Sequence, residues 1–288
     1  MNMQIGKKTF IILQTSTIPK LMTSVLPAVF ASLLYLGAGG MQLMQISQSE
    51  NIRVRSVTIL SSIALFCHGI VVWQTIYVDG QLNLGFYKTW ALIFFVINIS
   101  GIILSLYRPI KNLLIILFPL SGIAVLISAF GPNTLITDGS YGIGLAIHIG
   151  SSILAYSILT IAAAQAAILA IQDHHLKNRI TNGLVRVMPP LQLMEATLFE
   201  LIWIGVVMLT LALSTGILFM EDIFSQHLVH KTVLSMFAWL IFSILLLGRH
   251  QLGWRSLTAV RFTITGFCLL LLAFFGSKLV LELVLQPL

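Results

Sequence analysis

Histidine is the residue type in this chain whose placement best suits ligand chemistry. Two of the seven histidines, His68 in FCHGIVVWQ and His148 in LAIHIGSSILAYSIL, lie inside long uncharged apolar runs. An imidazole within hydrocarbon is disfavoured unless it faces the interior of a helix bundle and finds a partner, so it is a functional candidate by default. A neutral imidazole is also the usual axial ligand of b-type haem iron. Iron coordination and hydrogen bonding between packed helices are therefore the two explanations to separate.

Polar neighbours indicate that both imidazoles face inward. They recur at helical spacing, as Ser61, His68 and Thr75 at intervals of seven and as His148, Ser152 and Tyr156 at intervals of four. Residues at these intervals share one face of a helix. This spacing alone favours a polar interior face and leaves both explanations open.

The elements that carry these residues are membrane spans. The 288 residues are 58% hydrophobic and 9% charged, whereas soluble domains carry about 25% charged residues. Eight apolar runs are long enough to cross about 30 Å of hydrocarbon. They are Leu21–Leu43, Ser56–Tyr77, Trp90–Tyr107, Leu113–Phe130, Ile143–Ile171, Leu198–Met220, Val233–Gly248 and Val260–Val280. Continuous apolar runs indicate helices rather than barrel strands, so we expect an all-α polytopic bundle of eight transmembrane helices.

Basic residues set the expected orientation. Ten Lys and Arg side chains follow helices one, three, five and seven, against three on the other side of the membrane beyond the amino-terminal tail. The positive-inside rule makes those four loops cytoplasmic and places both termini outside. Lys7, Lys8 and Lys20 disagree with this orientation. Either translation starts at Met22 or the tail is atypical, and we therefore interpret residues 1–21 as an amino-terminal extension and residues 22–288 as one membrane domain.

The expected depths rank the candidate haem ligands. At 1.5 Å per residue, His148 lies about 8 Å and His68 about 13 Å below the outer membrane surface. One tilted haem b could bridge them if helices two and five are neighbours. His230 lies at the outer surface and is a substitute ligand, whereas His250 lies at the inner surface. The predicted set is therefore His68, His148, His230 and His250, with the first two preferred.

Several other classes of protein are disfavoured. The chain has no HExxH, P-loop, GxSxG or CxxC motif and no pair of intramembrane aspartates, so we expect no enzyme activity. The net charge of +7 comes from residues beside lipid headgroups rather than from a nucleic-acid surface. Glu200 is the one acidic candidate for proton-coupled transport, and near the cytoplasmic end of helix six it is better explained as an interfacial side chain.

Several segments give the chain a family resemblance. They are FCHGIVVWQ, LAIHIGSSILAYSILTIAAAQAAIL, MPPLQLMEATLFELIWIGVVMLTLALSTG, HKTVLSMFAWL, HQLGWR and AFFGSKLV. In order and spacing the chain resembles the cytochrome c assembly membrane proteins, in particular the small inner-membrane branch of YpjD-like and HemX-like proteins. The resemblance covers nearly the whole chain from Met22 and implies a multi-pass protein of the bacterial inner membrane. It also implies haem as a ligand and cytochrome c maturation components as partners, and His148 matches the family's outer-side histidine.

Two departures limit what the resemblance implies. The haem exporters and cytochrome c synthases of the family carry a tryptophan-rich outer loop, where this chain reads MEDIFSQHLVHKTVLS, and a histidine after the last helix, where it reads LELVLQPL. We therefore do not expect this chain to present haem to apocytochrome, but we do expect haem binding within the bundle. The alternatives are a haem-free accessory or regulatory protein with the same fold and a transporter of a small solute.

Overall fold

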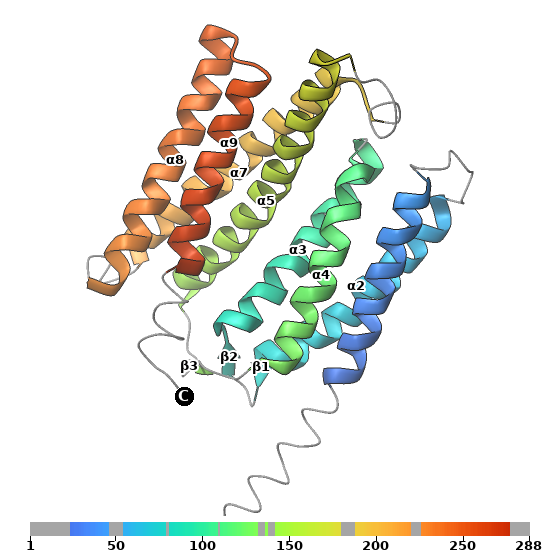
Figure 1. The fold of residues 1–288 in the computed structure, drawn as a ribbon. Helices are drawn as coiled ribbons and strands as arrows, with labels where there is room; N and C mark the ends of the chain where they lie inside the picture. The colour runs from blue at the N-terminus through green and yellow to red at the C-terminus, as the bar shows by residue number, and fades with distance from the viewer. Residues whose placement is uncertain are drawn as a thin grey trace, which may run out of the picture.

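The computed structural model describes residues 24–45, 54–78, 81–108, 110–131, 136–137, 142–179, 188–219 and 226–276. Within these ranges eight helices are long and apolar enough to span a membrane, which confirms the predicted eight-helix bundle (Figure 1). Residues 1–21, predicted to be an extension, lie outside the described part of the chain.

Three of the helices extend well beyond the apolar runs that predicted them. The first helix is Ser24–Gln45. It is followed by α2 (Val54–Ile76), α3 (Phe86–Tyr107), α4 (Lys111–Phe130), α5 (Ile143–Lys177), α7 (Leu191–Phe219), α8 (Gln226–Leu252), α9 (Leu257–Leu271) and a π-helical turn, η1 (Leu272–Gly276). The predicted Ile171 end of helix five and the predicted Leu198 and Val233 starts of helices six and seven therefore fall several residues short. Polar residues in these extra turns pair with one another, so the helices continue past the apolar window.

The helices form two groups. Figure 1 shows the first helix, α2, α3 and α4 on one side, here called the N-terminal half, and α5, α7, α8 and α9 on the other, here called the C-terminal half with η1. Within the C-terminal half, α5 packs along α7 and α9, and α8 packs on α9. Within the N-terminal half, α2 and α4 pack on α3, and α3 also packs on α5 and so joins the two halves.

The main core lies along the C-terminal half and its junction with α3 and α4. Its fully buried side chains include Ile97, Leu117, Leu159, Leu198 and Phe242. Large apolar side chains such as Trp73 and Trp203 are exposed on the outside of the bundle. Lipid tails are as apolar as these side chains, so this exposure fits a protein whose solvent is the bilayer.

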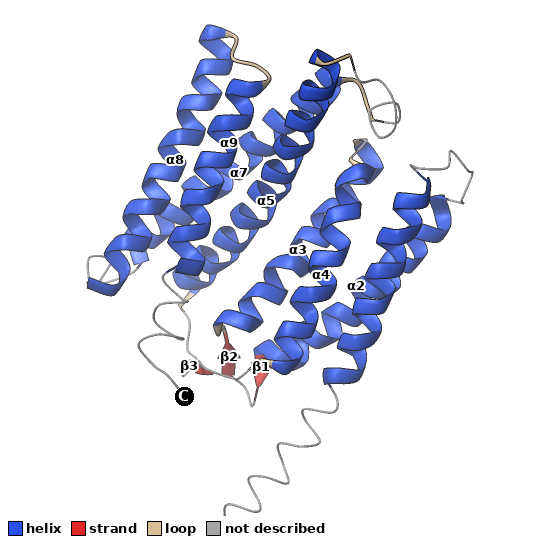
Figure 2. Ribbon diagram, in the orientation of Figure 1, coloured by secondary structure: helices blue, strands red, loops and turns tan. Residues whose placement is uncertain are grey.

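A small antiparallel sheet closes one end of the N-terminal half (Figure 2). It consists of β1 (Tyr77–Val78), β2 (Gln81–Asn83) and β3 (Ile136–Thr137), in which Leu82 lies opposite both Tyr77 and Thr137. The sheet ties the α2–α3 connection to the α4–α5 connection. The basic ends of α5 and α8 lie at the opposite end of the bundle, so the sheet marks the end that the positive-inside rule assigns to the outside. We call it the outer end.

Candidate functional site

His148 lies in the second turn of α5 at the outer end. Its ring is half-buried against α7, where Nδ1 lies 2.7 Å from the carbonyl oxygen of Ala212. The ring also packs against Gly216, one turn further along α7. A larger residue at that position would occupy the space that the imidazole fills. The α5–α7 interface thus provides both a hydrogen-bond acceptor and room for the ring.

The Ala212 carbonyl determines which nitrogen of His148 can act as a ligand. A carbonyl oxygen only accepts hydrogen bonds, so the Nδ1–H group is the donor in this pair. In the neutral imidazole Nε2 then carries the available lone pair. Ligating histidines usually donate the other ring N–H to a carbonyl or a carboxylate, and this contact fixes both tautomer and orientation. His148 is therefore held in one orientation and one tautomer by its neighbouring helix.

Three further side chains surround the outer end of α5 near His148. The Lys231 ammonium, on α8, lies 5.3 Å from the centre of the Phe274 ring on η1. That ring lies 5.0 Å from the ring of Tyr156, which is two turns beyond His148 on α5. A cation and two aromatic rings thus accompany the histidine.

His68 has different surroundings in the N-terminal half. Its side chain is completely buried, and Nδ1 lies 3.3 Å from the hydroxyl of Tyr35 on the first helix. The Tyr35 and Phe95 rings meet the imidazole edge-on, with centroids 5.8 and 5.5 Å away. Within the described residues no hydrogen-bond partner is found for Nε2. The ring is thus enclosed by neighbouring side chains with no exposed edge, and its role as a haem ligand stays a prediction.

The structure does not bring His68 and His148 together. The condition for one haem between them was that helices two and five are neighbours, but α2 packs on α3 and α4, whereas α5 packs on α7, α9 and α3. The two imidazoles belong to different halves of the bundle. The choice of His68 and His148 as a ligand pair stays a prediction, and this packing gives it no support.

The remaining predicted ligands lie at the two ends of α8. His230 is exposed and directly precedes Lys231 at the outer end. Its role as a substitute ligand stays a prediction. His250 is exposed in the last turn of the same helix, twenty residues further on, so about 30 Å separates them along the axis. His250 therefore lies far from His148.

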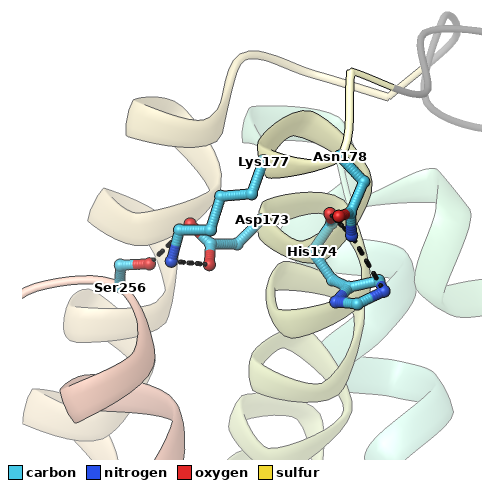
Figure 3. Close-up of polar contacts among 5 residues, drawn as sticks. All are labelled: Asp173, His174, Lys177, Asn178 and Ser256. Carbon is cyan, nitrogen blue, oxygen red and sulfur yellow. Dashed lines mark hydrogen bonds and ion pairs between the residues drawn. The ribbon is translucent and has the colours of Figure 1, made fainter.

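Acidic groups at the cytoplasmic end are paired. Asp173 of α5 lies 2.7 Å from the Lys177 ammonium and accepts a 2.9 Å hydrogen bond from the Ser256 hydroxyl (Figure 3). Beside them Asn178 donates to the carbonyl of His174, and its side-chain nitrogen lies 3.1 Å from Nε2 of that histidine (Figure 3). These contacts end α5 and connect it to the start of α9.

Two carboxylates of α7 are paired in the same region. Glu195 accepts a 2.6 Å hydrogen bond from Arg249, and Glu200 is paired with Arg108. The Arg249 guanidinium also lies 4.7 Å from the centre of the Phe199 ring. Glu200, the candidate for proton coupling, is thus an exposed and paired interfacial residue, as its place in the sequence indicated.

Sequence reasoning missed the residues that position His148. The Ala212 carbonyl has no side-chain signature, and Gly216 is one small residue in an apolar helix. Lys231 was counted only as one of three outer charges, although its place beside His230 in HLVHK was a usable signal. Lys88, the other described outer lysine, was counted in the same way. It is buried and donates to the carbonyls of Ser128 and Gly131 at the end of α4.

This geometry defines a class of protein, a polytopic helical membrane bundle with an oriented histidine near its outer surface. Residues 56–285 match the family described as cytochrome C assembly protein, and the chain belongs to that family. It is 37% identical over 234 residues to the inner membrane protein YpjD of Escherichia coli K12, covering 80% of this chain and 88% of that protein. The protein is thus a bacterial inner-membrane member of the family, with a membrane role in cytochrome c assembly.

More distant relatives extend the comparison. The chain is 26% identical over 198 residues to protein HemX of Brevibacillus brevis, covering 66% of this chain and 70% of that protein. It is 27% identical over 238 residues to a 28.8 kDa protein of Azospirillum brasilense, covering 80% of this chain and 88% of that protein. No solved structure matches the chain at a significant level.

Proposed function

We propose that this protein binds haem b through His148 at the outer end of the C-terminal half and handles haem during cytochrome c assembly. The observation that carries the proposal is the contact between His148 Nδ1 and the Ala212 carbonyl oxygen, which leaves Nε2 as the ligating atom. Haem is then cargo, and the chain acts by binding and handing it on rather than as an enzyme.

The chain contributes three things to such a site. The α5–α7 interface fixes the imidazole, so no rotamer freedom is lost when Nε2 binds iron. Phe274, which is half-buried and packs on Tyr156, provides aromatic surface for an apolar macrocycle. The position near the outer surface gives haem a short route to the compartment in which c-type cytochromes are assembled.

An absorption spectrum of the purified full-length protein tests the proposal. After expression with ample haem we expect a Soret band and sharp reduced α and β bands, and we expect His148→Ala to lose them. His174→Ala, at the cytoplasmic end, is the matched control and should keep the spectrum, and His68→Ala should also keep it. A haem-free wild type would overturn the proposal and favour an accessory protein or a solute transporter. Loss of the bands in His68→Ala alone would move the site to the N-terminal half.

A further inference from the structure

Lys231 is a cation in the first turn of a membrane span. It is the third residue of the span Val229–Leu252, at its outer end. The three ion pairs found among the described residues involve Arg108, Lys177 and Arg249, and none involves Lys231. Its identified neighbour is the face of Phe274, 5.3 Å away. A cation–π contact holds the ammonium in place but does not pair its charge with an anion among the described residues.

Lys88 shows how this bundle satisfies a lysine for structural reasons. Both lysines lie near the outer end, and the Lys88 ammonium donates to two carbonyl groups that end α4, one of them at 2.9 Å. That arrangement is a helix cap, and it explains the residue completely. Within the described ranges no equivalent set of carbonyl acceptors is found for Lys231. Its charge therefore calls for another explanation.

The aromatic contacts of Lys231 supply that explanation. Phe274 connects the Lys231 ammonium to Tyr156, which lies on the same helix as His148, and both Lys231 and His148 lie near the outer ends of their helices. The cluster thus presents a nitrogen ligand for a metal, aromatic surface and one positive charge. A ligand that matches all three is an apolar metal macrocycle with carboxylate arms.

We propose that Lys231 is a carboxylate-binding residue that pairs with a propionate of the haem whose iron His148 ligates. This rests on the proposed function, since it assigns the second contact of the same site. The ammonium donates a charge-assisted hydrogen bond to the carboxylate oxygen, and such bonds are stronger than neutral ones. His148 determines where the iron sits, and Lys231 determines how the macrocycle is turned about that bond.

The test compares iron protoporphyrin with its dimethyl ester, in which both carboxylates are blocked. Both are titrated into the full-length protein in detergent, as wild type, Lys231→Met and Lys231→Arg. Wild type should prefer the free acid by at least about tenfold, the effect of one hydrogen bond to a charged group. Lys231→Met should lose that preference by binding the free acid more weakly while binding the ester unchanged. Lys231→Arg should keep the preference because it keeps the charge.

Lys177→Met is the matched control, since that lysine is 60% exposed at the opposite end of the bundle. It should bind both compounds as wild type does. A preference for the free acid that survives in Lys231→Met overturns the assignment, and so does an equal loss of affinity for both compounds, because the latter marks a structural role. A wild type that binds neither compound would overturn the proposed function itself. That result is distinct from the two outcomes that overturn only the Lys231 assignment.

Discussion

Replacement of Gly216 by alanine tests the His148 arrangement without altering the ligand. A methyl group on Gly216 would lie 3.0 Å from Cε1 and 3.1 Å from Nδ1 of His148. These separations are shorter than ordinary carbon contacts of about 3.5–4.0 Å. The ring must therefore move by a few tenths of an ångström, and because Nδ1 is one of the crowded atoms, its 2.7 Å bond to Ala212 must lengthen or bend.

The expected effect follows from that one hydrogen bond. A typical bond of this kind contributes about 0.5–1.5 kcal/mol, and about 1.4 kcal/mol corresponds to a factor of ten in affinity. We expect Gly216→Ala to weaken haem binding by about 3- to 10-fold. In a helix, alanine is favoured over glycine by about 1 kcal/mol, which offsets the weakened hydrogen bond, so the haem-free protein should be about as stable as wild type. Affinity should therefore fall without a matching fall in stability.

The assay pairs a haem titration with thermal unfolding of the haem-free protein in detergent. Gly150→Ala is the matched control, because Gly150 lies two residues from His148 on α5 and a methyl group there meets nothing within 4 Å. That control should raise stability slightly and leave affinity unchanged. The reasoning is refuted if Gly216→Ala binds haem as wild type does, or if its affinity falls only together with the stability of the haem-free protein.

Two further predictions concern the frame of the bundle. Arg249→Met should lower the free energy of unfolding by about 2–4 kcal/mol, because it leaves Glu195, whose side chain is 9% exposed, without its partner. Arg108→Met breaks the exposed pair with Glu200 and should lower the free energy of unfolding by only about 0–1 kcal/mol. Denaturant unfolding in detergent compares the two variants. Reporter fusions at Leu288 should be active for alkaline phosphatase and silent for green fluorescent protein. The reverse pattern would overturn the orientation and the assignment of His148 to the outer surface.

The spans could be predicted because their signal is local. A run of about twenty apolar residues suffices to identify a membrane helix, whatever surrounds it. The helix ends could not be predicted, because charged residues lie in the last turns of α5 and the first turns of α7. Asp173 pairs with Lys177 one turn away, and Glu195 pairs with Arg249 on another helix. The sheet was missed because strands of two and three residues are too short to show alternation. What the sequence could not supply was pairing between distant segments.

The same limit explains which parts of the candidate site could be predicted from the sequence. His148 could be chosen from depth and residue type, but its orientation depends on a backbone carbonyl 64 residues away, which any residue at that position would supply. Neighbouring helices cannot be read from eight similar apolar runs. The depth argument therefore ranked His68 and His148 together, although α3 and α4 lie between the helices that carry them.

The interior of the N-terminal half gives buried polar groups another meaning. Asn98 of α3 donates a 2.6 Å hydrogen bond to Ser121 of α4, and the hydroxyls of Thr75 on α2 and Ser128 on α4 lie 3.5 Å apart. Contacts of this kind hold helices together in lipid, where apolar surface gives no driving force for association. The contact of His68 with Tyr35 on the first helix belongs to the same set. Burial alone thus does not make a membrane histidine a ligand. A ring whose Nδ1–H donates to a backbone carbonyl of the neighbouring helix, as in His148, is the stronger indication, because that contact fixes the tautomer and the orientation.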